Sequence, residues 1–151
     1  MLTLTNCLPS VDLDQVDCRL NFANHDPVIR CGNKILIIDD DPVLCLGLHI
    51  RLEANSYDTC FANDAESAFN TALSERPDLI ILDIGLPDYD GYFVMESLNA
   101  FPELADVPII VLTGRNRFVH EKRCHDAGVK RFFEKPVDDR RLLTAIRQYL
   151  G

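Results

Sequence analysis

Five polar residues, each at or just after the end of a short apolar run, have the side chains that phosphoryl chemistry requires. They are Asp39, Asp40, Asp83, Thr113 and Lys135. If these side chains gather in one place, the carboxylates repel one another by roughly a few kcal/mol per close pair, so they need protons or a cation. Carboxylate oxygens suit Mg²⁺, which binds one or two protein carboxylates together with waters and phosphate oxygens. The set therefore predicts a Mg²⁺ site that attracts a phosphoryl donor.

The same residues include the groups that a phosphoryl transfer needs. The Thr113 hydroxyl can donate a hydrogen bond to one phosphoryl oxygen, and the Lys135 ammonium can place its charge beside another. A carboxylate such as Asp83 can attack phosphorus and hold the group as an acyl phosphate. The residue types thus indicate transfer of a phosphoryl group to an aspartate.

Short apolar runs that alternate with amphipathic stretches from Lys34 onward are typical of a parallel sheet covered by helices on both faces. We expect five strands, over residues 34–39, 57–62, 79–82, 109–112 and 130–133. The first, third and fourth are almost wholly apolar, so they should lie at the centre of the sheet. Ligands of doubly wound sheets bind outside the carboxyl ends of the strands, so the five polar residues should share one crevice at that edge.

Five helices are expected between and after these strands. The first begins with Asp41 as its N-cap and buries leucines at four-residue spacing. The others start near residue 63, after Gly91, near residue 116 and near Asp138. The third should carry Phe101 in its apolar stripe, and the fourth has the weakest stripe of the five.

The first 32 residues break this pattern. They contain Pro9 and Pro27, and their apolar residues show little periodicity. We expect residues 1–32 to be a tail that is disordered or packs loosely, followed by one domain over residues 33–151. A length of 151 residues suits one compact domain better than two, and we expect no output domain after the last helix.

Composition argues against several classes of function. The net charge of −9 disfavours direct binding to nucleic acid, which depends on lysine and arginine contacts to phosphates. No apolar run reaches the roughly 18 residues of a membrane span, and the first residues lack the basic and apolar regions of a signal peptide. The six cysteines lack the spacing of a zinc site, and the chain has enough apolar residues to build a core without disulfides. We therefore expect a cytoplasmic protein with reduced thiols that binds neither nucleic acid nor membranes.

Four motifs, in order at the expected strand ends, resemble those of the receiver domain of bacterial two-component response regulators. The acidic-pair motif, the phosphoacceptor motif and the two remaining ones are matched by ILIIDDDP (35–42), LIILDIGLPDYDG (79–91), VLTG (111–114) and EKP (134–136). Thr113 lies thirty positions after Asp83, and Lys135 lies a further twenty-two on, as in the family. The resemblance covers about residues 33–151. It implies the flavodoxin-like fold of a chemotaxis-type receiver, with a doubly wound, five-stranded parallel sheet in the order 2-1-3-4-5 and five helices.

The resemblance also implies a metal-binding role for each matching residue. Asp83 would be phosphorylated, and Asp40 and Asp83 would coordinate Mg²⁺ directly. Asp39 would act through a metal-bound water. The third protein ligand would be the backbone carbonyl of Gly85, two residues after the phosphoacceptor.

At the phosphoryl group, the resemblance implies that Thr113 and Lys135 contact the oxygens. Phe132 would be the switching aromatic, which turns inward as the threonine moves. The family often has tyrosine at this position, so Phe132 would couple to the switch through packing alone. Gly85 and Arg115 occupy the two positions that tune hydrolysis of the acyl phosphate in the family. A cis peptide bond is also implied before Pro136.

The implied function is transfer of a phosphoryl group to Asp83 from a histidine of a sensor histidine kinase or of a histidine phosphotransfer protein. Such a receiver is no enzyme beyond catalysing its own phosphorylation and dephosphorylation. It would bind a downstream protein, or a second copy of itself, through its fourth helix, fifth strand and fifth helix. Residues 1–110 carry a net charge of −14 and residues 111–151 one of +5, so an acidic partner would be steered to this face.

Other functional classes fit the same fold. An interaction module that is never phosphorylated would have little use for the complete set of polar residues, and labelling with acetyl phosphate distinguishes it. A flavodoxin-like enzyme or an aspartate phosphatase is a further alternative. Such a phosphatase usually carries a second aspartate two positions after the nucleophile, where this chain has Gly85. His120 and Cys124 are four residues apart and can face one metal, but two ligands do not make a site.

Overall fold

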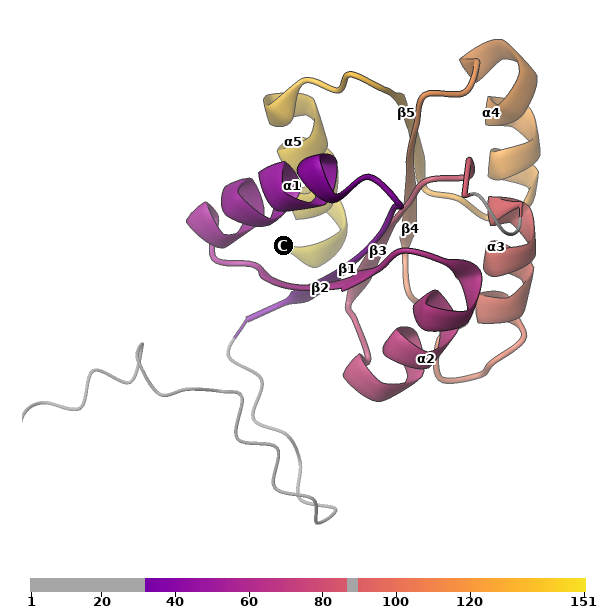
Figure 1. Cartoon of the computed structure of the whole chain (residues 1–151), viewed down its shortest axis with the longest axis horizontal. Coiled ribbons are helices and arrows are strands. Elements are labelled where there is room, and N and C mark those ends of the chain that lie inside the picture. The colour runs from indigo at the N-terminus through magenta and orange to yellow at the C-terminus, as the bar shows by residue number, and fades with distance from the viewer. Residues whose placement is uncertain (1–31, 87–89) are drawn as a thin grey trace, which may run out of the picture. The chain divides into compact units, whose positions relative to one another are not determined.

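The computed structural model describes residues 32–86 and 90–151. At the centre of these residues lies one parallel sheet. Its strands are β1 (Lys34–Ile38), β2 (Asp58–Ala62), β3 (Leu79–Leu82), β4 (Ile109–Thr113) and β5 (Arg131–Glu134). They pair in the order β2-β1-β3-β4-β5 (Figure 1), which confirms the expected doubly wound, flavodoxin-like sheet. The tail expected over residues 1–32 lies outside the described residues except for Gly32.

Five helices cover the two faces of the sheet. They are α1 (Pro42–Ala54), α2 (Ala65–Glu75), α3 (Gly91–Asn99), α4 (Arg117–Asp126) and α5 (Asp139–Leu150). Figure 1 shows α1 and α5 on one side of the sheet and α2, α3 and α4 on the other, and the buried side chains form one cluster on each face. Within residues 32–86 and 90–151, no helix combines the length and the apolar character that a membrane span requires.

The central strands are buried from both sides. Along β1, Leu36 and Ile38 face α2, α3 and α4, whereas Ile35 and Ile37 face α1 and α5. Every residue of β3 and β4 is also buried. Because successive side chains of a strand point to opposite faces, a strand with two covered faces is apolar throughout. The continuous apolar runs therefore predicted the central strands correctly.

Side-chain caps define where the helices begin. The carboxylates of Asp41 and Asp138 accept hydrogen bonds from backbone N–H groups in the first turns of α1 and α5, which confirms both residues as caps. Asp64 caps α2 together with Ser67 in a capping box. This cap explains why α2 begins at Ala65 rather than near residue 63.

Some boundaries differ from those expected. β1 ends one residue earlier than predicted, β2 and β5 begin one residue later, and β4 and β5 each continue one residue further. The added residue of β4, Thr113, pairs with Glu134, and its carbonyl accepts a hydrogen bond of 2.8 Å from the Lys135 N–H. Parallel pairing thus extends β4 to the residue that carries the hydroxyl of the site.

The expectation that Phe101 lies on the third helix was wrong. α3 ends at Asn99, and Phe101 is 37% exposed, with its ring edge-on to Phe69 at 4.6 Å between centroids. The helical spacing of the apolar residues extends to Phe101, but the helix ends before it. Pro102 follows directly, and a residue before proline is disfavoured in helical conformation.

Candidate functional site

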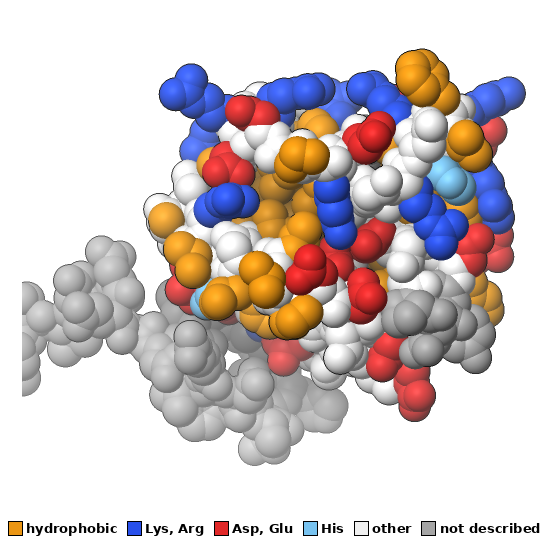
Figure 2. Space-filling model, turned by 45° about the horizontal axis from the view of Figure 1, so that its top comes forward, with side chains coloured by type: hydrophobic (Ala, Val, Ile, Leu, Met, Phe, Trp, Pro, Cys, Tyr) orange, Lys and Arg blue, Asp and Glu red, His pale blue; other side chains and the backbone are white. Residues whose placement is uncertain are grey.

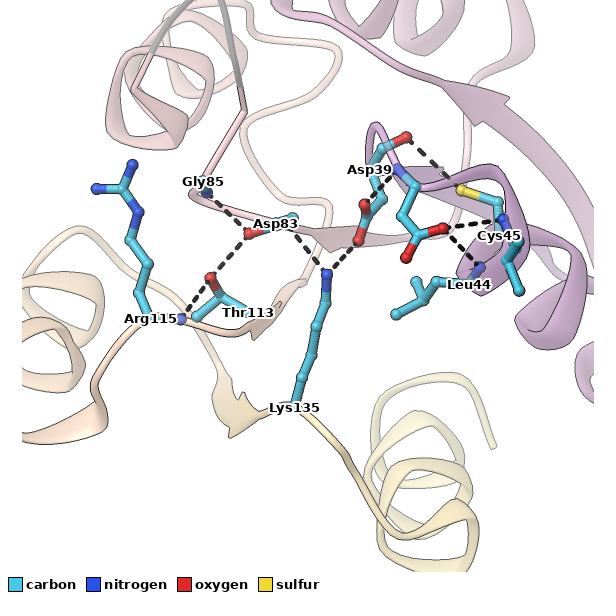
Figure 3. A network of polar contacts seen from close by, with 10 residues as sticks. Asp39, Leu44, Cys45, Asp83, Gly85, Thr113, Arg115 and Lys135 are labelled. Carbon is cyan, nitrogen blue, oxygen red and sulfur yellow. Dashed lines mark hydrogen bonds and ion pairs between the residues drawn. The ribbon is translucent and has the colours of Figure 1, made fainter.

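The polar residues identified in the sequence lie together at the carboxyl edge of the sheet. Figure 3 shows Asp39, Asp83, Thr113 and Lys135 there. Asp39 and Asp40 follow β1, Asp83 follows β3, Thr113 ends β4 and Lys135 follows β5. Parallel pairing of these strands brings all four strand ends to one edge. The apolar runs therefore position the reactive side chains, because burying the strands fixes where each run ends.

The Asp83 carboxylate accepts hydrogen bonds from three directions. Its Oδ1 accepts one from Thr113 Oγ1 at 2.8 Å and one from the Gly85 N–H at 2.8 Å, and its Oδ2 accepts one from Lys135 Nζ at 3.1 Å. Asp83 is 8% exposed. The carboxylate is thus held in one orientation near the surface of the domain.

Lys135 links Asp83 to Asp39. Its Nζ lies 2.8 Å from Asp39 Oδ2, while the Asp41 N–H donates to Asp39 Oδ1 at 2.9 Å. Burial raises the pKa of the Asp39 carboxyl above its ordinary value, and the hydrogen bonds from Lys135 and Asp41 offset only part of that effect. Burial alone would lower the pKa of the Lys135 ammonium, but its contacts with Asp39 and Asp83 outweigh burial and raise that pKa. The site therefore stabilises the charged form of Lys135.

The three aspartates can also hold a cation. Asp39, Asp40 and Asp83 can each place one carboxylate oxygen within 4.8 Å of the others, with Asp40 exposed and the other two buried. One ammonium group compensates for only part of the charge of three carboxylates. A hard divalent cation with a preference for oxygen, such as Mg²⁺, fits this donor set. The carbonyl of Gly85 stays a predicted ligand.

Two hydrogen bonds orient the Thr113 hydroxyl. The hydroxyl donates to Asp83 and accepts a hydrogen bond of 3.3 Å from the Arg115 N–H. The Arg115 side chain extends toward Gly85, where an added Cβ would lie 3.3 Å from Arg115 Nε (Figure 3). Gly85 and Arg115, the two positions that the resemblance associates with hydrolysis of the acyl phosphate, therefore lie close to each other beside Asp83.

Phe132 lies on β5, which β4 separates from the strand that leads to the phosphoacceptor. It is 8% exposed, pairs with Val111 of β4, and packs in the cluster that covers the α2, α3 and α4 side of the sheet. It also lines a groove between α4 and α5. Its role as a switching residue stays a prediction. The Lys135–Pro136 peptide bond is cis, as the resemblance implies.

The close packing of Gly91 against Ile84 was not expected from the sequence. This glycine starts α3, and its N–H donates to the Ile84 carbonyl at 3.1 Å. A Cβ on Gly91 would lie 2.4 Å from Ile84 Cα. The sequence signal was a glycine directly after the capping residue Asp90, but the close approach depends on how α3 packs beside Asp83.

Known proteins of one family match most of this chain. A family model of the response regulator receiver domain matches residues 35–147. The polar-differentiation response regulator DivK of Brucella anthropi is 30% identical over 118 residues, which cover 78% of this chain and 96% of that protein. The DNA-binding dual master transcriptional regulator RpaA of Synechocystis is 35% identical over 117 residues, which cover 78% of this chain but 48% of RpaA. The chain thus spans about half the length of RpaA.

Two solved structures share the architecture. The receiver domain of the sensor histidine kinase PA1611 from Pseudomonas aeruginosa, crystallised with a magnesium ion coordinated in its active site cleft, superposes with a TM-score of 0.72. It is 29% identical, and the match covers 80% of this chain and 98% of that one. A CheY-like receiver domain protein from Methanospirillum hungatei has a TM-score of 0.73 at 28% identity, over 79% of this chain and 94% of that one.

Proposed function

Since the chain belongs to the response regulator receiver domain family, we propose that Asp83 accepts a phosphoryl group from a phosphohistidine in a Mg²⁺-dependent reaction. The donor would be a sensor histidine kinase or a histidine phosphotransfer protein. The observation that carries this proposal is the environment of the Asp83 carboxylate. It is held by Thr113 and Lys135 and shares a donor set for a cation with Asp39 and Asp40.

The transfer follows from the positions of these side chains. Mg²⁺, when bound, supplies positive charge that lets the phosphoryl oxygens approach three carboxylates. An Asp83 oxygen attacks phosphorus, the bond from phosphorus to the donor nitrogen breaks, and its electron pair stays on the donor imidazole. Thr113 and Lys135 already donate to the two Asp83 oxygens, so both are within reach of a phosphoryl group attached there.

Phosphoryl labelling tests the proposal directly. With Mg²⁺ and acetyl phosphate, the intact protein should gain the mass of one phosphoryl group, and Asp83→Asn should gain none because an amide is no nucleophile for phosphorus. Asp126→Asn, which removes an exposed carboxylate at the end of α4, is the matched control and should label like wild type. Mass spectrometry of the intact chain measures all three. Labelling of Asp83→Asn at the wild-type level would refute the assignment, and an unlabelled wild type would favour a non-phosphorylated interaction module.

The proposed output is a change in partner binding at α4, β5 and α5. Basic side chains gather along one rim of the molecule above a central group of acidic ones (Figure 2). The groove between α4, β5 and α5 is lined by Arg117, Arg131, Arg140 and Arg141. An acidic surface on a downstream protein, or a second copy of this domain, is the proposed partner, and the cytoplasm is the proposed location.

The switch can be followed without knowing the partner. Beryllofluoride, which mimics a bound phosphoryl group, should change amide exchange chiefly between Thr113 and Arg141, because Thr113 and Lys135 lie where β4 and β5 lead into α4 and α5. Helix α2 should stay nearly unchanged and serves as the internal reference. Changes confined to the neighbours of Asp83, with residues 115–133 silent, would show that this face does not switch.

A further inference from the structure

Helix α4 buries little apolar surface, although it forms part of the proposed output face. Of its ten fully described residues, Cys124 is the one that is buried, while Phe118 and Val119 are 96% and 67% exposed. Packing of an apolar stripe therefore cannot fix this helix as firmly as it fixes α5, which buries Leu142, Ala145 and Ile146. The position of α4 must depend on other contacts.

Tyr92 of α3 makes several of those contacts. Its hydroxyl lies 2.9 Å from Nδ1 of His120, and the Cys124 thiol donates to the same hydroxyl at 3.7 Å. The Arg123 guanidinium stacks on the Tyr92 ring at 3.6 Å from its centroid and lies 4.0 Å from Asp90, the cap of α3. Positions 120, 123 and 124 share one face of a helix. A single buried tyrosine thus contacts α4 through three side chains.

Tyr92 is also tied to the residue that follows the phosphoacceptor. It comes directly after Gly91, which approaches Ile84 so closely that a Cβ would clash with its backbone, and the Gly91 N–H donates to the Ile84 carbonyl. Ile84 and Gly91 are both buried. A shift of the backbone next to Asp83 must therefore move Gly91 and the start of α3 as well, because packed interiors transmit displacement.

We infer that Tyr92 is a positioning residue, which holds α4 against α3 through His120, Arg123 and Cys124 and relays the position of Ile84 to α4. This inference rests on the proposed function for its role in signalling. The route passes through α3, so it is separate from the path through Thr113 and Phe132. It requires the Tyr92 hydroxyl, whereas a plain core role would require only the ring.

Tyr92→Phe separates these two roles, because phenylalanine keeps the ring and its packing and lacks the hydroxyl. Hydrogen–deuterium exchange of the α4 amides, without any ligand, should be at least about fivefold faster in Tyr92→Phe than in wild type, as expected when a hydroxyl that contacts both His120 and Cys124 is lost. Amides of β1 should keep their wild-type rates. Tyr149→Phe, which removes a hydroxyl that donates to the Lys130 carbonyl at 3.4 Å, should leave α4 unaltered.

His120→Ala provides a second, independent readout. It should speed α4 exchange less than Tyr92→Phe does, because the hydroxyl keeps its contacts with the His120 carbonyl and the Cys124 thiol. The double variant should exceed Tyr92→Phe only slightly, since the contact with the His120 imidazole is already lost there. Beryllofluoride should then perturb α4 in Tyr92→Phe at most half as much as in wild type, while acetyl phosphate still labels Asp83 at the wild-type rate.

The positioning role of Tyr92 and its role as a relay can each be contradicted by a separate result. Unaltered α4 exchange in Tyr92→Phe, full additivity with His120→Ala, or equal acceleration in β1 would overturn the positioning role. An unchanged beryllofluoride response in α4 of Tyr92→Phe would overturn the relay. If wild type itself takes up no phosphoryl group, the proposed function and the relay both fail, and the exchange rates without ligand still decide whether Tyr92 positions α4.

Discussion

Gly91→Ala is expected to lower the free energy of unfolding by about 3 kcal/mol, because the structure leaves no space for a methyl group there. The added Cβ would lie 2.4 Å from Ile84 Cα and 3.0 Å from Ile84 Cβ. These atoms belong to the residue after Asp83 and cannot retreat without displacing the backbone of the site. Phosphoryl labelling of Asp83 should slow for the same reason. Denaturant titration of both proteins gives the difference in stability.

Gly47→Ala is the matched control and should have the opposite sign. Gly47 lies inside α1, and among the described residues no atom comes within 4 Å of the place its Cβ would take. Alanine is favoured over glycine in a helix interior by roughly 0.5–1 kcal/mol, so this variant should be more stable than wild type. A Gly91→Ala protein as stable as wild type would mean that the close approach of α3 to Ile84 does not exist in solution.

The sequence predicted the sheet well because its central strands are buried on both faces. The continuous apolar runs before Asp39 and Asp83 have no solvent-exposed side, so they point to a parallel sheet with helices on both faces. Once the strand order is doubly wound, the polar residue that ends each run must lie at one edge. The location of the candidate site was therefore predictable, because Asp83, Thr113 and Lys135 stand at or just after the ends of these runs.

Contacts between distant side chains were not predictable in this way. Nothing in the pattern of residues shows that Lys135 bonds Asp39 as well as Asp83, or that Tyr92 reaches His120, since these distances depend on how strands and helices pack. The spacing that placed Phe101 on a helix carried no information about where α3 stops. Local sequence determines periodicity, whereas tertiary packing determines which side chains meet.

The charges at the site predict a second large effect, which is the change that Mg²⁺ makes in the stability of the fold. Asp39 and Asp83 share the Lys135 ammonium, with Nζ to Oδ2 distances of 2.8 and 3.1 Å, so two of the three carboxylates are already partly compensated. Asp40 is exposed and has no bond to Lys135 in the described structure. Of the three carboxylates, Asp40 therefore offers a cation the least compensated charge, and it is also the one least needed to hold the fold.

Saturating Mg²⁺ is expected to raise the free energy of unfolding of wild type by about 2.7 kcal/mol when its concentration is a hundred times its dissociation constant, because the ion binds the folded site and not the unfolded chain. That corresponds to a rise of roughly 10 °C in the melting temperature of a domain of this size. Asp40→Asn should lose nearly all of this stabilisation by Mg²⁺ and should be slightly more stable than wild type without metal, since one source of carboxylate repulsion is gone.

Asp126→Asn, which changes the net charge equally but lies at the end of α4, is the control and should keep the full stabilisation by Mg²⁺. Thermal melts with millimolar Mg²⁺ and with a chelator measure all three, and a wild type indifferent to Mg²⁺ beside a responsive Asp40→Asn would contradict the assignment of these carboxylates to the metal.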